Sequence, residues 1–191
     1  MAEIVLYHHA QGLTDGVQAF AEELRQAGHT VHTPDLYEGH TYATLEEGIE
    51  YAKKTGFGAV MERGIEAAQS LPERVVYAGF SLGVMPAQNL TQTRPGAVGA
   101  LFYYSCLPTE EFGEWPTGVP VQVHAKEEDE FYLEDAEAAK ALVETVDGAE
   151  LFLYPGKEHL FADSSLPAYD EAAAKLMTER TLSFLARTTP A

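Results

Sequence analysis

A serine between two glycines is the first feature of this sequence that could do chemistry. Residues 79–83 read Gly-Phe-Ser-Leu-Gly, which places Ser81 in a G-x-S-x-G pattern. In such a segment a strand enters a sharp turn that leads into a helix, and the serine at the apex is a nucleophile. The flanking glycines let backbone pass where a Cβ would clash. Residues 74–78 read as a strand and residues 84–90 as a helix, which is the context that this turn requires.

A nucleophilic serine needs a histidine as its base. In alternating α/β chains the acid and then the histidine follow the serine, each after the end of a strand. Of the seven histidines, His159 follows a predicted strand at residues 150–154 and precedes the last predicted helix. His124 is the rival, but it precedes the acid candidates, and a histidine at a strand end is most often a packing residue. We therefore expect His159 to be the base.

The base in turn needs a carboxylate that orients its ring. The loop after the predicted strand at residues 119–124 reads Ala-Lys-Glu-Glu-Asp-Glu. An acidic run of this kind is most often a solvated surface. Asp129 is the preferred acid, but spacing alone does not separate it from Glu127, Glu128 and Asp135.

The elements that must position these residues alternate along the whole chain. Short apolar runs predict strands at residues 4–7, 30–33, 74–78, 97–104, 119–124 and 150–154. Amphipathic periods predict helices near residues 15–27, 45–53, 60–68, 82–91, 134–146 and 166–185. The last helix is expected to bury Tyr169, Ala172, Ala173 and Leu176. This alternation predicts an α/β fold with a mostly parallel sheet of about six strands, helices on both faces and a site beyond the carboxyl ends of the strands.

Composition favours one globular domain over residues 1–191, with 46% hydrophobic and 22% charged residues. The net charge of −18 repels phosphate backbones and anionic lipids, so nucleic-acid and membrane partners are not expected. The single cysteine, Cys106, excludes an intramolecular disulfide and is expected to be a small hydrophobic residue. The sequence has no visible secretory signal, which predicts a cytoplasmic protein, as a monomer or homodimer.

The chain resembles the dienelactone hydrolase family of α/β-hydrolases over essentially its whole length. The resemblance rests on four short segments. They are Thr-Pro-Asp-Leu-Tyr at 33–37, the pentapeptide at 79–83, the loop at 124–131 and Tyr-Pro-Gly-Lys-Glu-His-Leu-Phe-Ala at 154–162. The resemblance implies that Ser81 is the nucleophile, Asp129 the acid and His159 the base, and so it selects Asp129 among the competing carboxylates. It also implies that the N-terminal strands of the family's sheet are absent.

The chain departs from the family's pattern at three positions. The family's type enzymes carry a cysteine where this chain has Ser81. A glutamate that interacts with the nucleophile in those enzymes falls at or near His9, which makes His9 a candidate to lie near the substrate. The arginine that helps to bind the carboxylate of dienelactone falls on Asp163, where a carboxylate would repel an anionic substrate. Dienelactone itself is therefore not expected as the substrate.

Two backbone N–H groups are expected to bind the oxyanion. One belongs to Leu82, the residue after the nucleophile, and the other to Ala10 or its neighbour His9, after the first strand. A metal site is not expected, although His8, His9 and His124 lie at strand ends, because adjacent strand residues point to opposite faces.

These residues predict a serine hydrolase that cleaves a small carboxylic ester or lactone through an acyl-enzyme intermediate, with no cofactor. One alternative hypothesis is a non-catalytic binding protein, motivated by the changed loop after the first strand. A thioester or amide hydrolase would use the same three residues, so the sequence does not separate these substrates.

Overall fold

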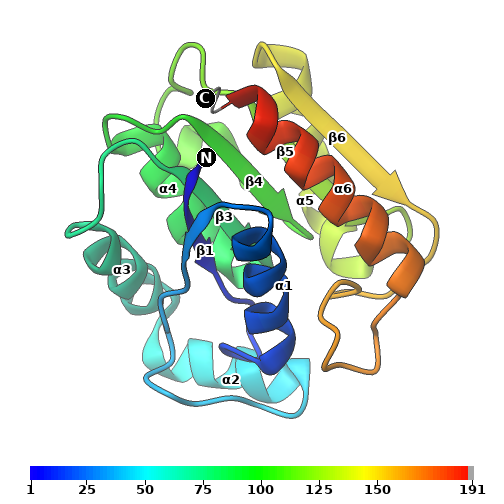
Figure 1. The fold of residues 1–191 in the computed structure, drawn as a ribbon. Coiled ribbons are helices and arrows are strands. Elements are labelled where there is room, and N and C mark those ends of the chain that lie inside the picture. Colours follow the sequence, from blue (N-terminus) through cyan, green and yellow to red (C-terminus); the bar gives the residue numbers. More distant parts are fainter. Residues whose placement is uncertain (189–191) are drawn as a thin grey trace.

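Six parallel strands form a single sheet in the computed structural model, which describes residues 1–188 (Figure 1). The spatial order of the strands is β2-β1-β3-β4-β5-β6, and each neighbouring pair is parallel. The strands are β1 (Glu3–Tyr7), β2 (Thr30–His32), β3 (Val76–Phe80), β4 (Gly99–Tyr103), β5 (Val121–Lys126) and β6 (Ala149–Tyr154). All six predicted strands are present, and the predicted parallel α/β sheet is confirmed.

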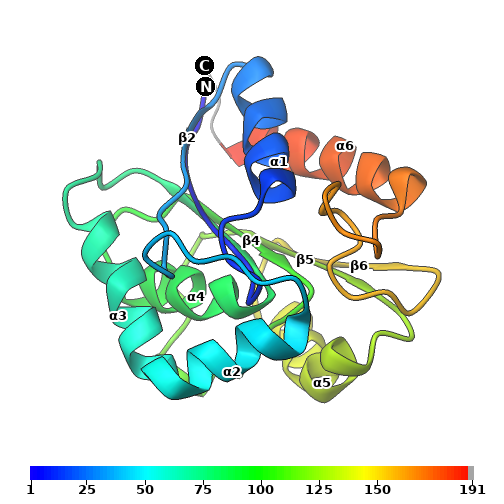
Figure 2. The same cartoon turned by 90° about the horizontal axis from the view of Figure 1, so that it is seen from below.

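Helices cover both faces of the sheet. They are α1 (Asp15–Gln26), α2 (Leu45–Thr55), α3 (Phe57–Ala68), α4 (Val84–Thr93), α5 (Glu130–Thr145) and α6 (Glu171–Thr188), with 3₁₀ turns at Ser81–Gly83 and Thr109–Glu111. Figure 2 shows α1 and α6 together on one face and α2, α3, α4 and α5 on the other. Within residues 1–188, none of these helices combines the length and apolar character that crossing a bilayer demands.

The sheet divides the core into two hydrophobic clusters because successive strand residues point to opposite faces. In β1, Ile4 and Leu6 join the cluster that contains α1 and α6, whereas Val5 and Tyr7 join the cluster of the other face. The central strands β3, β4 and β5 are buried along their whole length. This explains the nearly continuous apolar runs of β3 and β4 in the sequence. β5 instead alternates apolar residues with the buried polar side chains of Gln122, His124 and Lys126.

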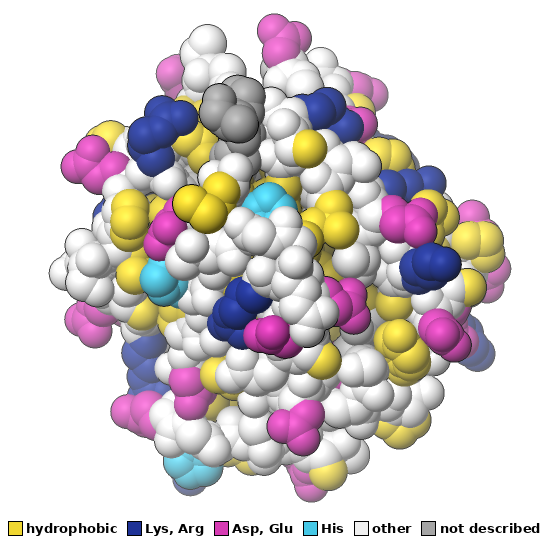
Figure 3. Space-filling model, in the orientation of Figure 1, with side chains coloured by type: hydrophobic (Ala, Val, Ile, Leu, Met, Phe, Trp, Pro, Cys, Tyr) yellow, Lys and Arg dark blue, Asp and Glu magenta, His cyan; other side chains and the backbone are white. Residues whose placement is uncertain are grey.

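The face with α1 and α6 carries a mixed distribution of charge. Figure 3 shows its Asp and Glu side chains scattered among Lys and Arg side chains rather than gathered in one patch. The excess of acidic residues over basic ones, 30 against 12, is therefore not concentrated on this face into a single binding surface.

Helix boundaries differ from the sequence prediction at three places. The predicted helix at 82–91 is divided into the 3₁₀ turn and α4, and α5 begins at Glu130 rather than at residue 134 because Asp129 caps it. The last helix begins at Glu171, where the Asp170 carboxylate accepts a hydrogen bond from the backbone N–H of Ala173 at 3.1 Å. Residues 166–170 therefore belong to the preceding loop.

The buried face predicted for the last helix is wrong at three of its four positions, since only Ala173 is buried. Tyr169, Ala172 and Leu176 are exposed, and the face toward the sheet consists of Ala173, Ala174, Met177, Thr181, Phe184 and Leu185. The polar Thr181 interrupts the apolar period in the sequence. In the fold its hydroxyl is satisfied by the Tyr103 hydroxyl, at 3.0 Å, so burying it costs little.

Adjacent substitutions in α6 test this orientation. Met177→Ala should lower the free energy of unfolding by about 2–5 kcal/mol, because a fully buried side chain leaves a cavity. Leu176→Ala, next to it on the solvent side, should change stability by about 0.5 kcal/mol or less. Urea unfolding followed by circular dichroism measures both. A larger loss for Leu176→Ala than for Met177→Ala would mean that the helix packs through the face that the sequence pattern favours.

Candidate active site

Ser81 lies in a strained turn between β3 and α4. Its φ is +49°, in the left-handed region that residues with a side chain rarely adopt. A Cβ on Gly79 would clash with the carbonyl group of Gly83, and a Cβ on Gly83 would lie 2.5 Å from the carbonyl oxygen of Tyr7 in β1. Both flanking glycines are therefore sterically required, and the strand, turn and helix that the motif predicts are present.

His159 joins Ser81 to Asp129 through two hydrogen bonds. Its Nε2 lies 2.9 Å from the Ser81 Oγ, and its Nδ1 lies 2.6 Å from the Asp129 Oδ2. A carboxylate at Nδ1 keeps the ring proton there and leaves Nε2 to accept the proton of the hydroxyl group. Asp129 is buried, and its second oxygen accepts the backbone N–H of Phe131 at 3.1 Å, which caps α5. The geometry is that of a nucleophile, a base and an orienting acid.

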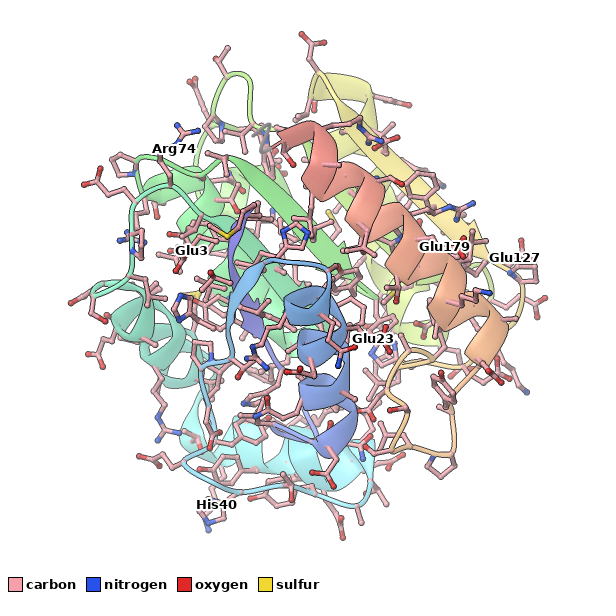
Figure 4. The ribbon with its side chains drawn as sticks, viewed as in Figure 1. Glu3, Glu23, His40, Arg74, Glu127 and Glu179 are labelled. Atoms are coloured by element: carbon pink, nitrogen blue, oxygen red, sulfur yellow. The ribbon has the colours of Figure 1, made fainter. Side chains whose placement is uncertain are left out.

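The competing carboxylates of the acidic loop do not contact His159. Glu127 and Glu128 are exposed, and Figure 4 shows Glu127 at the outer edge of the molecule. Asp135 instead accepts a hydrogen bond of 2.6 Å from the hydroxyl group of Ser105. Tertiary structure thus separates four carboxylates that spacing could not separate.

The rival base, His124, is buried within the sheet. Its ring nitrogens pair with the Tyr154 hydroxyl at 2.9 Å and with the side chain of Gln122 at 3.1 Å. Burial, with a smaller contribution from Arg180, lowers the pKa of His124 to about 3. The residue is therefore a neutral packing histidine outside the site.

Lys126, at the end of β5, holds the acid and base loops together. Its buried ammonium group donates to the Glu158 and Asp170 carboxylates, each at 2.8 Å. Burial lowers the pKa of Lys126, but these hydrogen bonds outweigh it and the net change is an increase. A backbone hydrogen bond of 3.0 Å from Glu128 to Gly156 also joins the two loops. Sequence reasoning missed Lys126, whose only signal is a lysine directly after an apolar strand.

A cavity of about 250 Å³ opens in front of the serine. Ser81, Leu82, Ala10 and His159 lie in its wall, together with the apolar side chains of Leu45, Ile49, Phe57, Met85, Leu107 and Phe131. Glu134 and Asp135 add two carboxylates, and within the described chain no lysine or arginine lines it. A larger open hollow of about 700 Å³ lies beside Lys126 but contains neither the serine nor the histidine of the hydrogen-bonded chain.

The loop after β1 presents the backbone of Ala10 to this cavity. The neighbouring N–H groups of Gln11 and Gly12 donate to the Nδ1 and the carbonyl oxygen of His9, at 3.2 and 3.0 Å. The N–H of Ala10 has no hydrogen-bond acceptor within residues 1–188. The carbonyl group of Ala10 packs directly against Gly48 of α2. A Cβ on Gly48 would clash with this carbonyl group and displace it. Among the predicted oxyanion donors, both Ala10 and Leu82 are thus cavity residues.

His9 and Asp163 are not brought into the cavity. Both side chains are buried, and the His9 Nε2 lies 2.7 Å from the Asp163 Oδ2. The expectation that Asp163 would face and repel an anionic substrate is wrong, because its carboxylate is directed into the protein and accepts hydrogen bonds there. Among the described residues, no group of three or more His, Cys, Asp or Glu could hold a metal ion.

The chain matches the model of the dienelactone hydrolase family over residues 1–189. Similar solved structures include a dienelactone hydrolase from Anabaena variabilis, with 16% identity, a TM-score of 0.69, and 98% of this chain and 87% of that chain covered. A dienelactone hydrolase-like promiscuous phosphotriesterase from metagenomic libraries is 16% identical, with a TM-score of 0.72, and the match covers 98% of this chain and 87% of that chain. A cold-adapted esterase from an Arctic intertidal metagenomic library is 19% identical, with a TM-score of 0.67, and the match covers 98% of this chain and 82% of that chain. No curated protein sequence matches the chain.

At these identities the structural similarity establishes the α/β-hydrolase fold, and the family match extends over nearly the whole chain. The fold and the resemblance that the sequence predicted are therefore both confirmed. This chain belongs to the dienelactone hydrolase family and is an enzyme of the hydrolase type.

Proposed function

We propose that this enzyme is a serine hydrolase that cleaves a small carboxylic ester or lactone. The observation that carries the proposal is the hydrogen-bonded chain from Ser81 through His159 to Asp129, at the wall of a cavity. The reaction proceeds by acyl transfer to the serine and needs no cofactor.

In the first step the Ser81 Oγ attacks the carbonyl carbon of the substrate while its proton passes to the Nε2 of His159. The tetrahedral intermediate collapses, the bond to the leaving oxygen breaks, and His159 returns the proton to that oxygen. A water molecule then gives a proton to His159 and attacks the acyl carbon. The bond to the Ser81 Oγ breaks, His159 returns the proton to this oxygen, and the acid is released. Asp129 holds the ring orientation and stabilises the imidazolium form in each step.

Two N–H groups are assigned to the oxyanion that forms in the tetrahedral intermediate. Leu82 follows the nucleophile. Ala10 lies in the cavity wall, and its N–H has no hydrogen-bond acceptor within the described chain. Backbone donors held in this way stabilise charge that develops only in the transition state.

The cavity favours a small and neutral substrate. A volume of about 250 Å³ with a mostly apolar wall suits a short acyl or alkoxy group. The carboxylates of Glu134 and Asp135 disfavour an anionic group there, because like charges repel. A thioester or amide substrate, or binding without turnover, is the competing hypothesis.

Labelling with a fluorophosphonate tests the activated serine, a suitable probe because one structural neighbour is named as a phosphotriesterase. The wild type should form a single adduct on Ser81, mapped by mass spectrometry. Ser81→Ala should form none, and His159→Ala should label about 10³-fold more slowly, since the hydroxyl group loses its base. Circular dichroism confirms that each variant is folded. A folded wild type that does not label would favour the binding-protein hypothesis.

The thiol of Cys106 should not take part in the reaction. Burial, with a smaller contribution from Asp135, raises the pKa of Cys106 to about 12, so almost no reactive thiolate exists at neutral pH. Iodoacetamide should leave both Cys106 and esterase activity unchanged in the folded protein, and should alkylate the residue after unfolding in guanidinium. Loss of activity that parallels alkylation of the folded protein would argue for a thiol mechanism.

Charge selectivity tests the substrate class. At about pH 8, kcat/KM for p-nitrophenyl valerate should exceed that for the p-nitrophenyl monoester of glutaric acid by about tenfold or more, because the latter adds a carboxylate to the acidic cavity. The double variant Glu134→Gln, Asp135→Asn should bring the ratio of the two kcat/KM values closer to one, because the cavity wall loses its negative charge. The pair Glu62→Gln and Glu66→Gln removes equal charge from exposed positions on α3 and should leave it unchanged. Equal rates for both esters in the wild type would refute the assignment.

A further inference from the structure

A buried hydrogen-bond network joins the loop after β1 to the loop that carries His159. The His9 Nε2 lies 2.7 Å from the Asp163 Oδ2, and both side chains are almost completely buried. Asp163 lies four positions after the proposed base, in the same turn, where its backbone N–H donates to the carbonyl group of Leu160 at 3.0 Å. A single side-chain contact therefore links the segment of the proposed oxyanion donor to the segment of the base.

Asp163 is held from several sides. Its Oδ2 also accepts the hydroxyl of Thr14, the residue that caps α1, at 2.5 Å. Its Oδ1 accepts the hydroxyl and the backbone N–H of Ser165, at 2.6 and 2.9 Å. Burial alone would raise the pKa of Asp163, but the hydrogen bonds from His9, Ser165 and Thr14 outweigh it and lower the value. The carboxylate is therefore a fixed anionic acceptor rather than a mobile group.

The tautomer of His9 follows from its two partners. Its Nδ1 lies 3.2 Å from the backbone N–H of Gln11 and must accept that hydrogen bond, so the ring proton resides on Nε2 and is donated to Asp163. Burial lowers the pKa of His9, which favours this neutral form. The ring thus holds the backbone N–H of Gln11 with one nitrogen and the Asp163 carboxylate with the other. Ala10 lies between His9 and Gln11 in the chain, so this contact closes a short loop around it.

On the basis of the proposed function, we propose that His9 is a positioning residue, which with Asp163 fixes the N–H of Ala10 at the oxyanion site relative to His159. His9 is completely buried and does not line the cavity, whereas Ala10 does. His9 therefore acts on the substrate through the backbone of Ala10 rather than by touching it.

Kinetics on a neutral ester separates positioning from simple stability. His9→Ala should lower kcat by about tenfold or more and change KM by less than about threefold, since oxyanion binding is felt in the transition state. His9→Gln should recover most of the wild-type kcat, because its carboxamide nitrogen can take the place of the donor at Nε2. Rates are expressed per serine titrated with the fluorophosphonate, so that unfolded protein does not count.

The matched control is His124→Gln, which alters an equally buried histidine in the sheet. It should lower stability without changing kcat per titrated serine. A double-mutant cycle adds Asp163→Ala: if the pair acts as one unit, the double variant should be no slower than the slower single variant. A kcat for His9→Ala within about threefold of the wild type, or a His9→Gln variant as slow as His9→Ala, would overturn the proposal.

Hydrogen exchange supplies a readout that needs no turnover. The amide of Gln11 should exchange faster in His9→Ala than in the wild type or in His124→Gln, because its acceptor is removed and the loop is released. Unchanged exchange in His9→Ala would overturn the positioning role even in an inactive protein. Failure of the wild type to label or to hydrolyse any ester would count against the proposed function alone.

Discussion

The close approach of the Ser81 turn to the backbone of β1 is the constraint on which the site depends. Gly83 lies so near the carbonyl groups of Tyr7 and His8 that no side chain fits between them. This contact places the strained serine beside the loop that begins at the end of β1, and so brings nucleophile and Ala10 to one cavity. A parallel sheet makes this possible because β1 and β3 are neighbours whose carboxyl ends lie at the same edge.

The remaining groups are fixed mainly by hydrogen bonds at loop ends, and the His159 ring also packs against the rings of Phe131 and Tyr104. Asp129 caps α5 while its carboxylate accepts a hydrogen bond from His159. Lys126 donates to the carboxylates of Glu158 and Asp170 and so joins the segments on either side of His159. Each buried charge has a partner of opposite charge or several N–H and O–H donors, which is the condition under which burial of charge is tolerated. The arrangement keeps the proposed catalytic groups oriented before a substrate enters.

The sequence predicted much of this protein because several signals are local. Apolar runs located all six strands. The glycines at 79 and 83 predicted the sharp turn at Ser81, because a side chain at either position would clash with the backbone. The order of acid and histidine after that turn is typical of chains that carry this serine motif, so it is readable without coordinates. The buried face of α6 was mispredicted because Thr181, satisfied by Tyr103, hides the apolar period.

The amino-acid sequence by itself determined the fold class, the position of the turn and the candidates for nucleophile, base and acid. Spacing left four carboxylates open, and the family resemblance selected Asp129. Only the tertiary structure shows that Asp129 contacts His159, that His9 and Asp163 are turned inward, and that Lys126 joins two loops. The physical reason is that these choices depend on distances of about 3 Å between side chains far apart in the chain, whereas sequence patterns report only local conformation and burial.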